Sequence, residues 1–127
     1  MRYISCLGVL ASTLLISSPA MAEVNGKWHV TGRMGDKPFA VDCQFIERDA
    51  RLTGVCTDVS TGDKGKAGKS HVLSQGGVTG DDIRWTYATK VMIISVDIEF
   101  SGKMTGAHMA GTVTAKGRQG TFTAEKI

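Results

Sequence analysis

Short stretches of alternating apolar and polar residues run from residue 26 to residue 126, separated by dipeptides that often contain glycine. Alternation with a period of two is typical of strands that bury one face, and no stretch carries the spacing of an amphipathic helix. Gly is abundant (16) and Pro is scarce (2). The pattern predicts an all-β protein with strands at about 26–34, 37–48, 51–58, 70–78, 81–88, 91–104, 107–115 and 118–126.

The pairing of these strands can be tested by arithmetic. Across a two-residue turn, opposed residues have position numbers with a constant sum, and they point to the same face. With a first turn at Gly35 and Asp36, Trp28 lies opposite Cys43 and Val30 opposite Val41, so one face is apolar on both strands. The same test selects further turns at 49–50, 79–80, 89–90, 105–106 and 116–117.

The cysteines Cys43 and Cys56 become directly opposed when the second turn lies at residues 49–50. Such neighbours on adjacent strands are close enough to form a disulfide. A metal site would need two further Cys or His ligands beside the pair, and alternation places His29, His71 and His108 on the outward face. We therefore predict a structural disulfide and no metal site.

The up-and-down order of the strands favours closure of the sheet on itself. Closure buries the apolar face of every strand and removes exposed sheet edges. Glycine beside phenylalanine on the inner face also suits a narrow interior. We predict an eight-stranded antiparallel β-barrel, with a flattened β-sandwich as the alternative.

The first 22 residues have the features of a secretory signal peptide. A basic residue precedes an apolar run, and the triplet Ala20, Met21, Ala22 predicts cleavage after Ala22. The apolar run is too short to span a membrane. We expect residues 23–127 to form one periplasmic or secreted domain, and the small formal net charge of +3 gives no indication of a nucleic-acid partner.

Two short motifs resemble those of calycin-type barrels, the group that contains lipocalins and avidins. Residues 26–28, "GKW", resemble the G-x-W motif that opens the first strand in these families, and residues 52–56, "LTGVC", resemble an avidin-like strand segment. Hairpins with glycine repeats and the ending "GTFTA" also resemble small exported bacterial β-barrel proteins. The resemblance implies a calycin-like barrel.

The longest connection, residues 59–69, marks the end of the barrel where we look for function. Long loops on rigid scaffolds are where binding residues concentrate. Cations gather around this end, which predicts either a basic mouth for an anionic ligand or partner, or simply a solvated rim. The basic rim comprises Lys64, Lys66, Lys69, Lys90 and Lys116.

Alternation also places a set of inward-facing side chains at the same end. Apolar walls with a phenol, a carboxylate and a guanidinium are typical of a small-molecule site, although a filled core would explain the same pattern. The candidate ligand-binding residues are Met34, Phe39, Asp58, Trp85, Tyr87, Met92 and Arg118.

Three functions fit these features. The first is an exported module that binds a small hydrophobic or amphipathic ligand, anionic ligands included, at the 59–69 end. The second is a periplasmic inhibitor or interaction protein that inserts the basic loop 59–69 into a partner. The third is a barrel isomerase or cyclase that uses Tyr87, Asp58 and Arg118 as acid, base and clamp. No histidine has a Cys or Ser partner that the pattern places beside it, so a catalytic triad is unsupported. We favour binding over catalysis and expect no cofactor.

Overall fold

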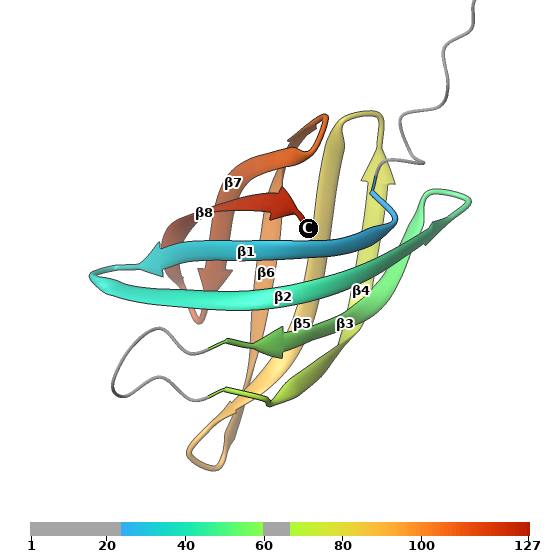
Figure 1. Cartoon of the computed structure of the whole chain (residues 1–127). Coiled ribbons are helices and arrows are strands. Elements are labelled where there is room, and N and C mark those ends of the chain that lie inside the picture. Colours follow the sequence, from blue (N-terminus) through green and yellow to red (C-terminus); the bar gives the residue numbers. More distant parts are fainter. Residues whose placement is uncertain (1–23, 60–66) are drawn as a thin grey trace, which may run out of the picture.

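A computed structural model of the chain describes residues 24–59 and 67–127, and these residues form a closed antiparallel barrel in which each strand pairs with the next in sequence (Figure 1). The strands are β1 (Gly26–Met34), β2 (Lys37–Arg48), β3 (Arg51–Asp58), β4 (Ser70–Thr79), β5 (Asp82–Val91), β6 (Ile94–Thr105), β7 (His108–Ala115) and β8 (Arg118–Lys126). The predicted all-β, eight-stranded barrel is therefore confirmed. Within the described ranges no helix is long and apolar enough to cross a membrane.

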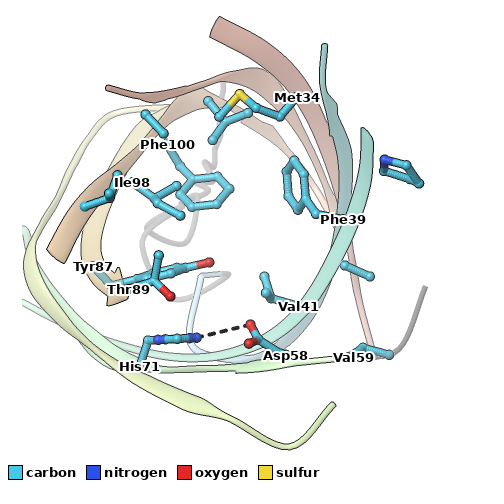
Figure 2. A pocket seen from close by; sticks show the side chains of 15 residues that line it. Met34, Phe39, Val41, Asp58, Val59, His71, Tyr87, Thr89, Ile98 and Phe100 are labelled. Carbon is cyan, nitrogen blue, oxygen red and sulfur yellow. Dashed lines mark hydrogen bonds and ion pairs between the residues drawn. The ribbon is translucent and has the colours of Figure 1, made fainter. Parts of the chain in front are cut away.

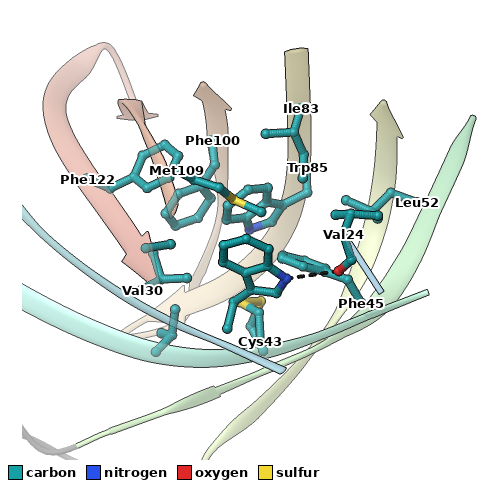
Figure 3. Packing of buried hydrophobic residues seen from close by; sticks show 14 of the residues in the cluster. Val24, Val30, Cys43, Phe45, Leu52, Ile83, Trp85, Phe100, Met109 and Phe122 are labelled. Atoms are coloured by element: carbon teal, nitrogen blue, oxygen red, sulfur yellow. Dashed lines mark hydrogen bonds between the residues drawn. A yellow bond between two sulfur atoms is a disulfide. The ribbon is translucent and has the colours of Figure 1, made fainter. Parts of the chain in front are cut away.

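The barrel is closed by pairing between its first and last strands. Strand β1 pairs with β2 on one side and with β8 on the other, from Trp28 opposite Lys126 to Met34 opposite Gly120. Because closure gives every strand two neighbours, the backbone hydrogen-bonding groups that an edge strand would expose are paired. The interior is hollow at one end (Figure 2) and filled by large side chains at the other (Figure 3).

Three of the predicted turns are wrong in position. The structure places them at residues 80–81, 92–93 and 106–107, where 79–80, 89–90 and 105–106 were expected. Moving a turn by whole residues changes the sum of opposed positions by an even number, so each residue keeps its face. Trp85, for example, was expected opposite Ile94 and lies opposite Phe100. Trp85 and Phe100 both point inward.

The prediction that His71 points outward is also wrong. The register between β4 and β5 shifts between Leu73 and Gln75, which leaves one extra residue in β4. Such a bulge reverses the alternation beyond it. His71 is buried with 6% of its surface exposed, whereas Val72 is exposed. His108 is exposed, as expected, and His29 is partly exposed beside Asp42.

The filled end holds a stack of aromatic side chains. Trp85 stacks on Phe100 with ring centroids 4.7 Å apart, and Phe45 and Phe122 pack against the Trp85 ring at 4.9 and 5.5 Å. Trp28 belongs to the same buried cluster and is fully buried. Large aromatic side chains bury the most apolar area per residue, so this end supplies most of the hydrophobic stabilisation.

Glycines on the inner face let neighbouring strands approach and cross within the narrow barrel. A Cβ atom at Gly111 would overlap the Ser101 carbonyl oxygen, and one at Gly32 would lie 2.6 Å from the Phe39 ring. Glycine at such positions marks close approach of another backbone or a bulky side chain. The pairing of Gly32 with Phe39 that the pattern predicted is present.

The predicted disulfide joins Cys43 and Cys56 between β2 and β3, with both residues fully buried. We expect the double substitution Cys43→Ala and Cys56→Ala to lower the free energy of unfolding by about 3 kcal/mol, because the bond closes a short loop in the unfolded chain. Denaturant unfolding followed by circular dichroism measures the loss. Equal midpoints for the oxidised and reduced wild-type proteins would contradict the prediction.

The two tryptophans provide a matched pair for measuring a buried hydrogen bond. The Trp28 indole nitrogen donates to the Val24 carbonyl at 2.9 Å, whereas the buried Trp85 indole nitrogen has no hydrogen-bond partner among the described residues. We expect Trp28→Phe to destabilise the protein by about 1–2 kcal/mol more than Trp85→Phe, since only the first leaves a buried carbonyl unpaired. Chemical denaturation of both variants measures the difference, and equal losses would show that the hydrogen bond contributes little.

Candidate functional site

A cavity of about 320 Å³ occupies the end of the barrel where β1, β3, β5 and β7 finish (Figure 2). It is open to solvent on one side, and most of its walls are apolar. The lining residues are Met34, Pro38, Phe39, Ala40, Val41, Asp58, Val59, His71, Tyr87, Thr89, Val96, Ile98, Phe100, Val113 and Ala115.

The cavity exists because inward-facing side chains on β5, β6 and β7 become smaller toward this end. Along β5 the inward series runs from Trp85 through Tyr87 to Thr89, and along β7 it ends with Ala115. Eight strands enclose room for side chains or for one small ligand. Smaller side chains at one end therefore leave a hollow above Phe100, which separates the cavity from the aromatic core.

Polar groups of the cavity gather on one wall. His71 Nε2 lies 3.1 Å from Asp58 Oδ1, where the ring nitrogen donates and the carboxylate accepts (Figure 2). The His71 ring stacks on Tyr87, with centroids 4.8 Å apart and an interplanar angle of 12°. The Tyr87 hydroxyl points into the hollow (Figure 2). We call Asp58, His71 and Tyr87 the polar wall.

Backbone hydrogen bonds hold Asp58 in place at the start of the 59–69 connection. The Asp58 amide donates to the Lys69 carbonyl at 2.8 Å, and the Gly68 amide donates to the Asp58 carbonyl at 2.9 Å. The Val59 amide donates to the Ala40 carbonyl at 3.0 Å. Both ends of this connection are thereby fixed to the barrel, so the carboxylate is presented to the cavity by a rigid support.

Burial keeps the Tyr87 phenol neutral. Loss of solvent around the hydroxyl raises the pKa of Tyr87 well above its ordinary value of 10.0, and the nearby negative charge of Asp58 raises it further. The side chain of Asp58 itself is 30% exposed, whereas that of His71 is 4% exposed. The polar wall therefore offers a neutral hydroxyl beside a carboxylate with partial access to solvent.

The structure brings four of the seven candidate ligand-binding residues to the cavity: Met34, Phe39, Asp58 and Tyr87. Trp85 lies below the cavity in the aromatic core. Met92 lies in the β5–β6 turn with 92% of its surface exposed, and Arg118 is exposed at the start of β8. Neither Met92 nor Arg118 lines the cavity, so the acid, base and clamp expected of an enzyme do not assemble there.

The described members of the basic rim, Lys69, Lys90 and Lys116, are exposed. Lys64 and Lys66 lie outside the described residues, as does most of the 59–69 loop on which an inhibitor would depend. Among residues 24–59 and 67–127 no cluster of three His, Cys, Asp or Glu side chains could hold a metal ion.

Sequence reasoning missed His71, the central residue of the polar wall. Its orientation depends on the bulge in β4, which alternation does not record. One signal was present, because the adjacent apolar residues Val72 and Leu73 fit either face of the strand. Thr89 and Val96 were missed for another reason, since the turn was expected at residues 89–90.

Comparisons with known proteins identify the fold and no family. No protein-family model matches the chain, and no curated protein matches it. Among solved structures, the redesigned β-barrel b11L5F_LGL is similar, with a TM-score of 0.64, 13% identity, and coverage of 85% of this chain and 95% of the other. The redesigned β-barrel mFAP1, bound to DFHBI, has a TM-score of 0.61, 18% identity, and coverage of 86% and 100%.

The buried phenol predicts a loss of stability in alkaline solution. Unfolding exposes Tyr87 and returns its pKa to about 10, so below that pH both states are neutral and stability is unaffected. Above about pH 10 the unfolded state loses the proton first, and the free energy of unfolding should fall by up to about 1.4 kcal/mol per pH unit.

The variant Tyr87→Phe should lack this component of the alkaline slope, measured by denaturant unfolding at a series of pH values. The other tyrosine is Tyr3, so phenolate absorbance of a chain that begins at residue 23 reports on Tyr87 alone. Phenolate appearing at about pH 10 while the protein is still folded would contradict the assignment.

Proposed function

We propose that this protein is an exported carrier or receptor for a small hydrophobic or amphipathic molecule. The observation that supports the proposal most directly is the solvent-accessible cavity at one end of an otherwise filled barrel. A volume of about 320 Å³ is at the small end of the range typical of ligand pockets. The ligand should therefore be compact, with a rigid or short apolar part.

The chemistry of the walls favours a particular orientation. An apolar body would pack against Phe39, Ile98 and Phe100, away from water. A group that donates hydrogen bonds, such as a hydroxyl or an amine, would meet the Asp58 carboxylate and the Tyr87 oxygen on the polar wall. An anionic group in that position would face the Asp58 charge, so it would be better placed at the rim near Lys69 or Lys116.

The fold and the expected compartment are consistent with this role. The redesigned barrel mFAP1 is bound to DFHBI, so a barrel of this fold can bind a small molecule. The motifs at residues 26–28 and 52–56 support a relationship to calycin-type carriers. The signal-peptide pattern of residues 1–22 supports export to a periplasmic or extracellular space.

Filling the cavity provides a direct test. Ala115 points into the cavity from β7, whereas Ala110 on the same strand is exposed on the outer wall. We expect Ala115→Phe to weaken binding of the amphipathic fluorophore anilinonaphthalene sulfonate at least tenfold, because a ring in the cavity displaces the aromatic part of the probe. Ala110→Phe should bind as the wild type does. Fluorescence titration measures both, and thermal unfolding verifies that each variant is folded.

A second measurement addresses the natural ligand. Native mass spectrometry of the protein purified from its own host should show a bound mass that is absent from the Ala115→Phe variant. Equal probe binding by the wild type and by folded Ala115→Phe would place the probe elsewhere and would contradict the proposal. A wild-type protein that carries no ligand and binds no apolar probe would do the same.

A further inference from the structure

The β5–β6 hairpin extends beyond the barrel wall at the same end as the cavity. Strand β4 pairs with β5 only as far as Tyr87, and β7 pairs with β6 only as far as Ile98. Beyond these residues the two strands pair, within the described part of the chain, only with each other, up to Val91 opposite Ile94. Figure 1 shows this two-stranded ribbon projecting past the neighbouring turns.

The tip of the ribbon is apolar and exposed. Met92 and Ile93 form the turn with 92% and 90% of their surfaces exposed, and Ile94 is 52% exposed. Consecutive exposed apolar residues at a projecting turn carry an aggregation hazard and have no role in the barrel's packing. We call Met92, Ile93 and Ile94 the apolar tip.

The backbone at the tip does not explain the choice of these residues. Met92 has a φ of 62°, in the left-handed region where Gly, Asn and Asp are favoured and a bulky side chain is disfavoured. Other turns of the barrel place Gly35, Gly80 and Gly106 at such angles, and Asp49, Ala50 and Lys116 adopt them as well. The tip differs from these turns because it combines such a position with large, exposed apolar side chains, the kind of surface that a partner covers.

Exposed cations lie at the same end of the barrel as the tip. They flank the connections at this end, where Asp36 and Asp97, the latter on β6 within the ribbon, are exposed acidic residues in the described ranges. The cations are Arg33, Lys37, Lys69, Lys90, Lys116 and Arg118. At the opposite end positive and negative charges alternate, as in the ion pair of Lys103 with Asp82 at 2.8 Å. The two ends therefore differ in charge, and the positive end is the one that carries the apolar tip.

We propose that this end docks on an anionic lipid bilayer, with the apolar tip inserted among the acyl chains and the cations against the head groups. Peripheral membrane binding depends on a small inserted apolar area together with electrostatic attraction to anionic lipids. The apolar tip supplies the inserted area, and the exposed cations supply the attraction. Lys90, two residues before Met92, has a long aliphatic side chain that can keep its charge at the head groups while the tip inserts.

A bilayer fits these features better than a second copy of the chain. Two copies meeting tip to tip would bring like charges together. A stable protein interface also buries about 800 Å² on each partner, far more than a two-residue turn and its flanks provide. The proposal stands on residues that do not line the cavity, and it provides a route by which an amphipathic ligand could enter the open end directly from lipid.

The test measures co-sedimentation of the exported protein with vesicles. Vesicles made of phosphatidylcholine and phosphatidylglycerol in equal parts should retain the protein, those of phosphatidylcholine alone should retain much less, and added salt should release it. The variant Met92→Asn with Ile93→Asn should partition about tenfold more weakly, since it removes the inserted area. Asn is favoured at the Met92 backbone position, so the hairpin should keep its shape.

Matched controls distinguish insertion of the apolar tip from nonspecific adsorption to vesicles. Val72→Asn removes a side chain that is 72% exposed on the outer wall and should leave vesicle binding unchanged. Lys90→Glu with Lys116→Glu should abolish the preference for phosphatidylglycerol, whereas Arg48→Glu at the other end should not. Ala115→Phe should bind vesicles normally even though it fills the cavity, so failure of ligand binding and failure of docking give different results.

Two outcomes would overturn the inference. The first is equal partitioning of the wild type and of folded Met92→Asn with Ile93→Asn, or no vesicle binding by the wild type. The second is an oligomer of the wild type, detected by analytical ultracentrifugation, that the same double substitution dissociates. That result would identify another copy of the chain as the occupant of the apolar tip.

Discussion

Pairing of β1 with β8 is the constraint on which the rest of the structure depends. Once Val30 lies opposite Ala124 on one side and Val41 on the other, the number of strands sets the width of the interior. A closed barrel cannot widen to accept larger residues or collapse onto smaller ones. Whatever volume the inward-facing side chains leave empty therefore remains as a cavity, which is why a gradient of side-chain size becomes a binding site.

That gradient divides the molecule into two parts with different tasks. The part built from Trp28, Phe45, Trp85 and the buried disulfide has the densest apolar packing, and it holds the strands in register. The other part has shorter inward side chains and polar groups that need an aqueous or ligand partner. Sites of low packing density are commonly supported by a rigid, well-packed region nearby. The two parts share the same strands, so rigidity at one end fixes the geometry at the other.

The sequence was a good guide to the fold and a partial guide to the site. Alternation is a local property that assigns each residue to one of two faces of the sheet. Moving a turn by one residue does not change which face a residue occupies. The inward set containing Phe39, Asp58 and Tyr87 was therefore predicted despite misplaced turns. A bulge is a property of two paired strands, and nothing in β4 alone requires the extra residue that turns His71 inward. The cavity was beyond sequence reasoning, because it depends on volumes left between strands.

The ribbon that carries the apolar tip also contributes to the cavity, and this joins the two proposed activities physically. Thr89 and Val96 line the cavity from the part of β5 and β6 that has no neighbouring strand. A two-stranded ribbon without further pairing is marginally stable in water, so contacts on its inner face would stabilise its folded conformation. A ligand packed against Thr89 and Val96 would supply such contacts. A bilayer would contact Met92 and Ile93 at the turn of the same ribbon. The two proposed activities therefore use one ribbon through different residues, Thr89 and Val96 toward the cavity and Met92 and Ile93 toward the bilayer.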